Sequence, residues 1–421
     1  MEESLRQGVL SKINKERVVK LVQDMVRFQS YTGEELELAE FMSSWLEKQG
    51  FQVDLQECVP TSYHKKSANV IATLKGTGGG MSLMFNGHLD IDPVCGEWKY
   101  DPFDPIIFDG NKINGIGTTN MKGGDAAMIE AVLALRDAGV RLKGDVIITL
   151  VCEELQGGWG ISKVLEKYTA EVGINAEPTW FTVGFNPSPG ISRLQIQING
   201  RAAHIHEQQK SINATVKMAN VITALDKFSF PFTKSKAFAK HTDYPFIYPT
   251  MSIGNSRSGV GEEFYDGRPG TIGDRAVIKM DVRYDNNQTE EMIYKDIQGL
   301  LDDLAKEDPE LTTRLEPIPT YITRPPYELP MDSYIVQVLK KAHREVFGED
   351  IKKSSHGGGQ DGAFMWTKAK IPTVLYGLCG ASQHDPSVRV DTSDLYITVD
   401  ELDSLAKVFC LSCLEVCMTP K

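Results

Sequence analysis

The chain has 421 residues, of which 41% are hydrophobic and 24% are charged, and it carries a formal net charge of −12. This length suits two domains of ordinary globular composition, and the acidic balance without a basic stripe argues against nucleic-acid binding. The first residues, 1–6, carry acids and no apolar core, and the longest apolar run, 146–152, is too short to cross a bilayer. We therefore expect no signal peptide, no membrane span and a cytoplasmic location.

The cysteines indicate free thiols, because their number, seven, is odd and their spacing is scattered. Three of them, Cys410, Cys413 and Cys417, recur at helical spacing near the C-terminus. No histidine or cysteine pair accompanies them to complete a metal site. We therefore expect these three side chains to lie on a buried or interface face of a helix.

The N-terminal part predicts helices. The segment 32–35 reads as a capping box, in which Thr32 accepts from the third amide of a helix while Glu35 reaches back. Apolar residues follow at helical spacing, and Gly50 supplies a stop. The sequence thus predicts a helix along which Leu38, Phe41, Met42 and Trp45 recur at helical spacing.

Strands and helices then alternate, which indicates an α/β layer architecture. Strands are expected at 69–74, 82–86, 146–152, 172–175 and 372–376, and helices at 122–138, 331–346 and 398–416.

A different pattern interrupts this one after 187–190. The strand 193–199 alternates cleanly, with Leu194, Ile196 and Ile198 on one face. A helix at 212–228, two strands at 248–254 and 276–284 and a helix at 289–306 complete a βαββαβ-like block. The helix at 212–228 is expected to bury a stripe of Val216, Ala219, Ile222, Thr223 and Leu225. We predict a first α/β part at 1–190, an inserted α+β domain at 191–315 and a second α/β part at 316–421.

Metal-ligating residue types follow several of the predicted strands. His88 and Asp90 leave the strand 82–86, where His88 offers a ring nitrogen and Asp90 can orient the ring. Glu153 and Glu154 leave the most apolar strand of the chain, and adjacent carboxylates there are costly unless something binds them. Because neighbouring side chains on a strand point to opposite sides, one can ligate a metal while the other moves a proton.

Two further candidates have the same setting. Glu177 follows the strand 172–175, and His384 lies in a loop after the strand 372–376. Each alone is compatible with a solvated loop, but their joint occurrence points to one site. A mixture of imidazole and carboxylate ligands suits zinc, manganese or cobalt.

In this order the motifs resemble those of the aminoacylase, acetylornithine deacetylase, succinyl-diaminopimelate desuccinylase and glutamate carboxypeptidase family of co-catalytic metallohydrolases. The resemblance covers nearly the whole chain. It rests on His-x-Asp at 88–90, Gly-x-x-Asn-Met-Lys-Gly-Gly at 117–124, Glu-Glu at 153–154, Glu-Pro-Thr at 177–179 and the late His384. It implies a mixed-sheet, zinc-peptidase-like catalytic domain with an inserted ferredoxin-like domain that serves as lid and dimer contact, and therefore a homodimer or higher homo-oligomer.

The resemblance also implies the metal ligands. His88 and Glu177 would hold one divalent ion, Glu154 and His384 would hold a second, and position 120 would bridge them. Glu153 would be the general base for metal-activated water, and Asp90 would support His88. Backbone amides of the segment 357–359, including Gly358 and Gly359, would line the substrate site.

Two residues of the inserted domain receive roles in the same way. His204 would reach the active site of a neighbouring subunit and stabilise the oxyanion, although His206 competes for this role. Arg283 would hold a substrate carboxylate, for which its planar fork is suited. A structural ion pair of Arg283 with Asp281 or Asp285 is the alternative.

Asn120 departs from the family pattern, which has an aspartate at this position. An amide offers one good oxygen donor and no charge, so the site would hold two ligand carboxylates instead of three. Repulsion between two close dications is then less compensated. We expect the second ion to be weakly bound or absent, while one ion still suffices to activate water.

Three functions remain open at this stage. The first is hydrolysis of the amide bond of a small carboxylate-bearing molecule, such as an N-acyl amino acid or a short peptide. The second is a changed chemistry on the same scaffold, hydrolytic deamination of an aromatic or amidine-like amine such as a nitroanthranilate. Four of the five tryptophans lie near the site motifs, which would suit a flat or aromatic substrate. The third is a binding protein that has lost catalysis, against which the presence of Glu153 argues.

Overall fold

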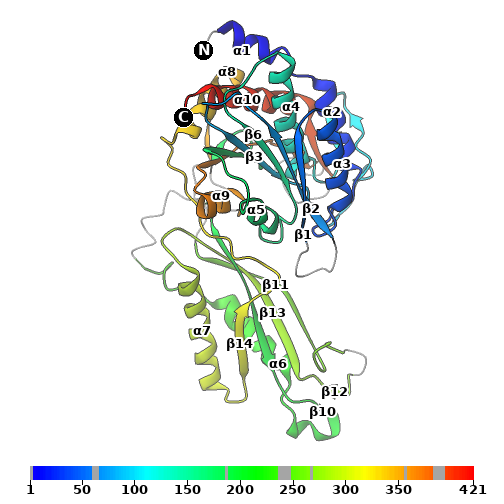
Figure 1. Ribbon diagram of the computed structural model, residues 1–421. Helices are drawn as coiled ribbons and strands as arrows, with labels where there is room; N and C mark the ends of the chain where they lie inside the picture. Colours follow the sequence, from blue (N-terminus) through cyan, green and yellow to red (C-terminus); the bar gives the residue numbers. More distant parts are fainter. Residues whose placement is uncertain are drawn as a thin grey trace. The chain divides into compact units, whose positions relative to one another are not determined.

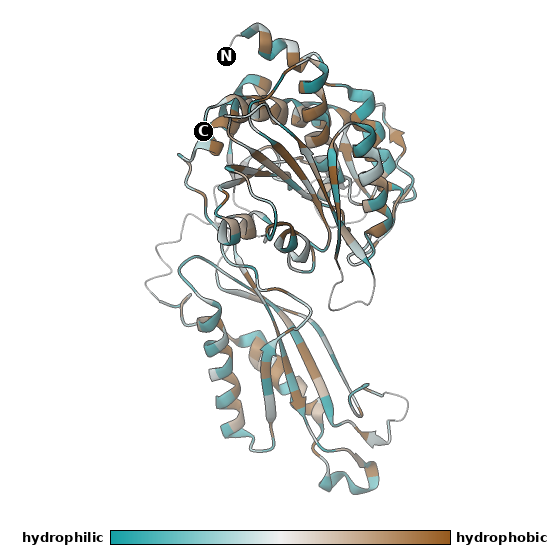
Figure 2. Ribbon diagram, in the orientation of Figure 1, coloured by the Kyte–Doolittle hydropathy of each residue, from teal (hydrophilic) through white to brown (hydrophobic). Residues whose placement is uncertain are grey.

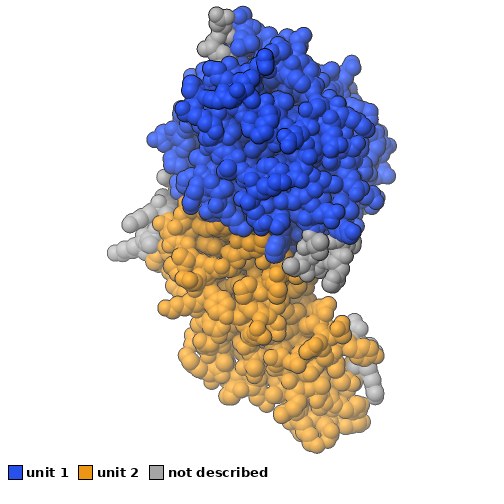
Figure 3. All heavy atoms as spheres, in the orientation of Figure 1, with its two compact units in different colours: residues 1–187, 327–421 blue, residues 188–326 orange. Residues whose placement is uncertain are grey.

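The structure, a computed structural model, describes residues 3–58, 66–184, 188–235, 248–265, 269–354, 358–382 and 394–421. The chain forms two compact units, Met1–Pro187 with Tyr327–Lys421, and Ser188–Pro326 (Figure 3). The second unit extends beyond residue 315, since Arg324 pairs with Ile191 in an isolated β-bridge. None of the helices described is both long and apolar enough for a membrane span.

The elements of the first unit are α1 (Glu3–Leu10), α2 (Lys15–Val26), α3 (Leu36–Lys48), β1 (Gln52–Cys58), β2 (Ser67–Leu74), β3 (Leu83–His88), β4 (Ile107–Phe108), β5 (Lys112–Asn114), the irregular turn η1 (Thr118–Lys122), α4 (Gly123–Asp137), β6 (Val146–Val151), α5 (Trp159–Val164), β7 (Val172–Asn175), β8 (Val183–Gly184), α8 (Tyr334–Phe347), β15 (Lys353–Ser354), α9 (Gly362–Ala369), β16 (Thr373–Leu375), β17 (Ala381–Ser382), β18 (Leu395–Thr398) and α10 (Val399–Met418) (Figure 1).

The main sheet of this unit has the order β1-β2-β6-β3-β7-β16. The strands β6, β3, β7 and β16 are parallel neighbours, whereas β1 and β2 run antiparallel to theirs. The sheet is therefore mixed, and the predicted α/β class is confirmed. Because β3, β6 and β7 are parallel, their carboxyl ends lie at one edge of the sheet, which is where α/β proteins place their chemistry.

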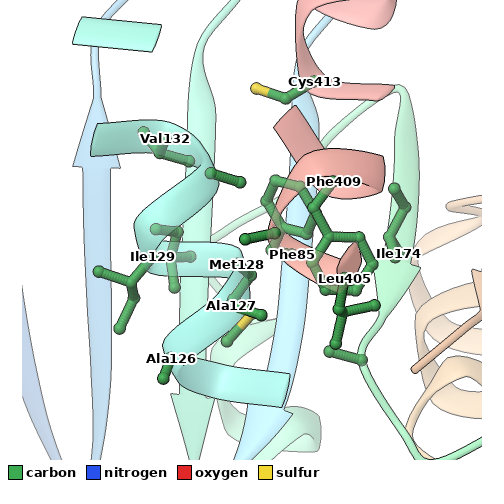
Figure 4. Packing of buried hydrophobic residues seen from close by; sticks show 14 of the residues in the cluster. Phe85, Ala126, Ala127, Met128, Ile129, Val132, Ile174, Leu405, Phe409 and Cys413 are labelled. Atoms are coloured by element: carbon green, nitrogen blue, oxygen red, sulfur yellow. The ribbon is translucent and has the colours of Figure 1, made fainter. Parts of the chain in front are cut away.

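The core of this unit forms where α4 and α10 pack on each other and on β3. The ring of Phe409 lies 5.3 Å from that of Phe85, and α4 contributes Met128 and Val132 to the same cluster (Figure 4). The central strands are mainly hydrophobic, whereas the helices around them alternate between hydrophobic and hydrophilic residues (Figure 2). Cys410, Cys413 and Cys417 are all buried on α10, as the sequence predicted for apolar side chains on a covered face.

The predicted capping box at 32–35 is wrong. Helix α3 begins one residue after Glu35, and its first turn has no side-chain cap. The hydroxyl of Thr32 instead donates to Asp90 at 3.0 Å, and the carboxyl of Glu35 accepts the backbone N–H groups of Gly33 and Glu153, both at 3.0 Å. The side chains of Thr32 and Glu35 therefore serve as hydrogen-bond partners for buried groups, the carboxylate of Asp90 and the N–H of Glu153, and do not cap the helix.

The second unit consists of β9 (Gly190–Asn199), β10 (Ala203–His204), the 3₁₀ turn η2 (Ile205–Lys210), α6 (Ala214–Lys227), β11 (Thr250–Gly259), β12 (Thr271–Ile272), β13 (Arg275–Tyr284), α7 (Glu290–Glu307) and β14 (Thr312–Pro317).

Its antiparallel sheet has the order β11-β13-β9-β14, which is the arrangement of a ferredoxin-like βαββαβ fold. Leu194, Ile196 and Ile198 of β9 are fully buried, as the alternation in the sequence predicted. The predicted face of α6 is only partly right. Leu225 is buried as predicted, but Val216 is 54% exposed, and the other buried residues of the helix are Ala214 and Val221. The sequence misplaced this face because alanine and threonine do not identify which side of a helix is covered.

Candidate metal centre

Three of the predicted metal ligands come together at the carboxyl edge of the main sheet. His88 is the last residue of β3, Glu154 follows β6 and Glu177 follows β7. Each offers one ligand atom, and these atoms all lie within 4.8 Å of one another. All three side chains are buried, with at most 5% of each residue exposed. Two carboxylates buried beside an imidazole require a compensating cation, so the residues suit a divalent ion.

The ring of His88 is oriented by Asp90. Its Nδ1 lies 3.0 Å from the carbonyl oxygen of Asp90 and 3.2 Å from Asp90 Oδ1. The Nε2 atom therefore turns toward the other ligands, 3.9 Å from Glu177 Oε1. This separation is near the roughly 3.4 Å expected between two ligand atoms that share one tetrahedral ion.

The charges around His88 favour its protonated form in the metal-free protein. Burial by itself lowers the pKa of His88, but the hydrogen bond that its ring N–H donates to Asp90 and the charges of Asp90, Glu177 and Glu154 raise it well above its ordinary value. A bound cation would compensate the negative charges of the same carboxylates. Proton and metal consequently compete for this position.

Asn120 lies within η1, and its side chain faces the Nε2 atom of His88. Its Oδ1 is 3.1 Å from His88 Nε2, so the amide lies beside the ring nitrogen that faces the other candidate ligands. The turn is held by Lys122, a fully buried lysine whose Nζ donates to the carbonyl oxygens of Met25 and Phe28 at 3.1 Å each. Burial lowers the pKa of Lys122 to about 7. The sequence pattern gives no sign of this tether, because lysine is ordinarily a surface residue.

The start of α4 packs tightly beside Glu177. A Cβ atom placed on Gly124 would lie 2.5 Å from the carbonyl oxygen of Ala176. Only glycine permits this approach, which brings η1 next to the end of β7. A Cβ atom on Gly123 would likewise lie 2.6 Å from the carbonyl oxygen of Thr118, so both glycines that follow Lys122 have a packing reason.

Glu153 lies beside the ligands in an unusual backbone conformation. Its φ of 55° is left-handed, which is uncommon for a residue other than glycine and often marks a functional site. It is 1% exposed, and neither carboxylate oxygen has a hydrogen-bond partner among the residues that the structure describes. Burial, then the negative charges of Asp90 and Cys58, raise the pKa of Glu153 to about 8.

The other predicted site residues have different outcomes. His384 and Gly357 lie outside the described residues. Gly358 and Gly359 are partly buried and precede α9. His204 and Arg283 belong to the second unit.

In that unit, the ring of His204 stacks on His206 with centroids 4.9 Å apart. Arg283 Nε donates to Asp281 Oδ1 at 2.9 Å, which is one of the two ion pairs foreseen as an alternative to substrate binding. The side chain of Arg283 is 34% exposed.

Comparison with known proteins extends these observations. The sequence profile described as peptidase family M20/M25/M40 matches residues 84–408. N-formyl-4-amino-5-aminomethyl-2-methylpyrimidine deformylase from Halalkalibacterium halodurans is 27% identical over 400 residues, covering 86% of this chain and 87% of that protein. Acetylornithine deacetylase from Proteus mirabilis is 26% identical over 384 residues, covering 89% of this chain and 90% of that protein.

A solved structure shows the same fold at low sequence identity. The dipeptidase Dug1p from Saccharomyces cerevisiae aligns over 100% of both chains with a TM-score of 0.80 and 15% identity. Since the family profile matches most of the chain, the protein belongs to peptidase family M20/M25/M40 and is a metal-dependent hydrolase of carbon–nitrogen bonds.

Proposed function

We propose that this protein hydrolyses the amide bond of a small molecule that carries a carboxylate, such as an N-acyl amino acid or a short peptide. The observation that carries the proposal is the convergence of His88, Glu154 and Glu177, with ligand atoms within 4.8 Å of one another, beside the buried carboxylate of Glu153. The names of the relatives support the reaction, since an acetylornithine deacetylase and a deformylase both remove an acyl group from nitrogen.

The ligand set supports zinc, manganese or cobalt, all of which accept imidazole and carboxylate together. His88, Glu154 and Glu177 would hold the ion, with the Asn120 oxygen next to them. His384 is proposed as a further ligand from the sequence motif. When bound, a divalent ion polarises the substrate carbonyl and makes water a better nucleophile. Because Asn120 is neutral, we infer that one ion is held tightly and a second one weakly.

The protein's own residues then handle the protons. Glu153 accepts a proton from the attacking water as the carbon–oxygen bond forms, and it returns that proton to the nitrogen as the carbon–nitrogen bond breaks. A carboxyl that is buried and unpartnered suits both steps, because it binds a proton more readily than a solvated glutamate. Asp90 keeps Nδ1 of His88 occupied, which leaves Nε2 for the metal.

Substrate selection is assigned by resemblance to Arg283 and to the amides of Gly358 and Gly359. The guanidinium of Arg283 is bonded through Nε to Asp281 Oδ1 at 2.9 Å, and its planar fork suits a carboxylate. Arg283→Lys removes the planar fork and keeps the charge. We expect this variant to raise KM for a carboxylate-bearing substrate more than it lowers kcat.

The test of the proposal uses Glu153→Gln. N-acyl amino acids, dipeptides and aromatic amines are offered to the metal-loaded protein, and free amino acid and ammonia are both measured. We expect free amino acid from the wild type and a fall of about 10² to 10⁴ in kcat for the variant, with the same metal content by elemental analysis. Ammonia released from an aromatic amine would favour the aminohydrolase instead, and unchanged turnover in the variant would remove Glu153 from its role.

We further infer a homodimer through the second unit. The strand β11 lies at an edge of its sheet, where unpaired backbone groups can add a strand from a second copy. Helix α6 exposes Val216 (54%) in the same unit. Light scattering should give the mass of a dimer, and Val216→Glu should shift it toward the monomer. If His204 acts across subunits, mixing inactive His204→Ala and Glu153→Gln proteins should restore activity.

A further inference from the structure

The turn that carries Glu153 and Glu154 is fixed through its backbone. The N–H of Glu153 donates to Glu35 Oε1 at 3.0 Å. The next two N–H groups donate to Asp90, from Glu154 to Oδ1 at 3.1 Å and from Leu155 to Oδ2 at 3.0 Å. Three consecutive amides of the Glu153–Leu155 turn are thus held by two buried carboxyl groups that come from other parts of the chain.

Both carboxyl oxygens of Glu35 accept hydrogen bonds. Its Oε1 also accepts the N–H of Gly33 at 3.0 Å, and its Oε2 accepts a short hydrogen bond from the hydroxyl of Ser67. The residue is completely buried. It stands immediately before α3 yet makes no cap to that helix. Glu35 therefore joins the segment before α3, the strand β2 and the Glu153–Leu155 turn at one point.

The conformation of Glu153 explains why such a joint is needed. A left-handed φ of 55° costs free energy for a side chain with a Cβ, and it persists only where the surroundings impose it. Within the described part of the chain, the carboxylate of Glu153 has no hydrogen bond of its own to hold it. Its position is thus determined through the backbone of the turn, where Glu35 is the partner of its N–H.

We propose that Glu35 is a positioning residue for the hydrolytic reaction. Its carboxyl oxygen accepts the N–H of Glu153 and locks the left-handed turn, which places Glu153 for proton transfer and Glu154 among the metal ligands. This inference rests on the proposed function for its catalytic part. The role requires an acceptor at the position of Oε1, and it does not require a negative charge.

The experiment compares Glu35→Gln, Glu35→Leu and the control Glu37→Gln, which lies two residues on at an exposed position of α3. Glutamine keeps an acceptor oxygen of the same reach, and its amide can donate to the Ser67 hydroxyl. Leucine keeps the volume and removes the acceptor. For each protein we measure kcat and KM with an N-acyl amino acid. In the metal-free protein we measure hydrogen exchange of the segment 152–155 and of β6.

We expect Glu35→Leu to lower kcat about 100-fold, which is typical of a displaced reacting group, with KM changed less than about threefold. Its 152–155 segment should exchange at least about tenfold faster while β6 stays protected. Glu35→Gln should retain kcat within about fivefold and keep the protection, and Glu37→Gln should match the wild type. If the leucine variant fails to fold, Glu35→Asp replaces it, because the shorter side chain withdraws the acceptor from Glu153.

Two results would overturn the inference. One is wild-type kcat and exchange in Glu35→Leu or, where that variant does not fold, in Glu35→Asp. The other is an equal loss in Glu35→Gln and Glu35→Leu, since a requirement for charge would then replace the requirement for an acceptor. Failure of the proposed function is distinguishable, because a wild type without amide hydrolysis leaves the exchange measurement on the metal-free protein intact. That measurement alone then decides whether Glu35 holds the turn.

Discussion

Glu153 should destabilise the metal-free protein at alkaline pH, and Glu153→Gln should relieve this. The carboxyl is 1% exposed with no partner among the described residues, and burial together with the charges of Asp90 and Cys58 raises its pKa from 4.5 to about 8. A carboxyl whose pKa is raised on folding binds its proton more tightly in the folded state. Its contribution to stability is therefore complete below pH 4.5 and is lost as the pH rises through 8.

The size of the effect follows from the same pKa. At about 1.4 kcal/mol for each factor of ten in proton affinity, the full change is about 5 kcal/mol, of which about 4 kcal/mol falls between pH 5 and pH 9. Entry of water into the metal-free site reduces this figure, so we expect about 2 to 4 kcal/mol. Glutamine has nearly the same shape and does not titrate. The difference in unfolding free energy between variant and wild type should accordingly grow by this amount from pH 5 to pH 9.

The assay is urea unfolding in the presence of a chelator, followed by tryptophan fluorescence. All five tryptophans lie in the first unit, so the signal reports the unit that contains Glu153. The exposed Glu47→Gln on α3 serves as control and should change by less than about 0.5 kcal/mol at either pH. A difference for Glu153→Gln that stays within 1 kcal/mol across this range would refute the reasoning, because the carboxyl would then be solvated in the folded state.

Three further predictions concern the metal centre and its packing. Asn120→Asp adds a carboxylate beside His88 Nε2, so we expect two tightly retained ions after dialysis where the wild type keeps one; equal metal contents by elemental analysis would contradict this. The raised pKa of His88 means that metal binding must displace a proton, so affinity should fall as the pH drops, by up to about tenfold per pH unit, with proton release visible by calorimetry in buffers of different ionisation enthalpy. Gly87→Ala would bring a Cβ within 1.9 Å of Asp125 Oδ1 and should lower the free energy of unfolding by about 1–3 kcal/mol or more. The control Gly8→Ala has open space around it in α1 and should be neutral or slightly stabilising. If urea unfolding finds Gly87→Ala neutral, the close contact with Asp125 relaxes freely and the prediction is wrong.

Much of this protein is determined locally in the sequence. Apolar runs followed directly by His88, Glu154 and Glu177 identified strand ends with metal-binding chemistry, and strict alternation identified the buried face of β9. These features can be predicted from the sequence because each depends on a few consecutive residues and on the period of one element. The left-handed conformation of Glu153, by contrast, has no counterpart in the local pattern, since glutamate rarely adopts it.

The tertiary structure decided which groups meet. Glu35 and Glu153 are 118 positions apart, and only the packing of α3 beside β2 brings the acceptor to the amide. For the same reason, the local pattern at 32–35 predicted a helix cap, whereas Glu35 in fact accepts the N–H of Glu153 in the candidate active site. Lys122 is a comparable case, because its carbonyl partners lie at the end of α2, 94 and 97 residues away. Sequence patterns report the periodicity and propensity of single elements, whereas the partner of a buried polar group depends on how those elements are packed together.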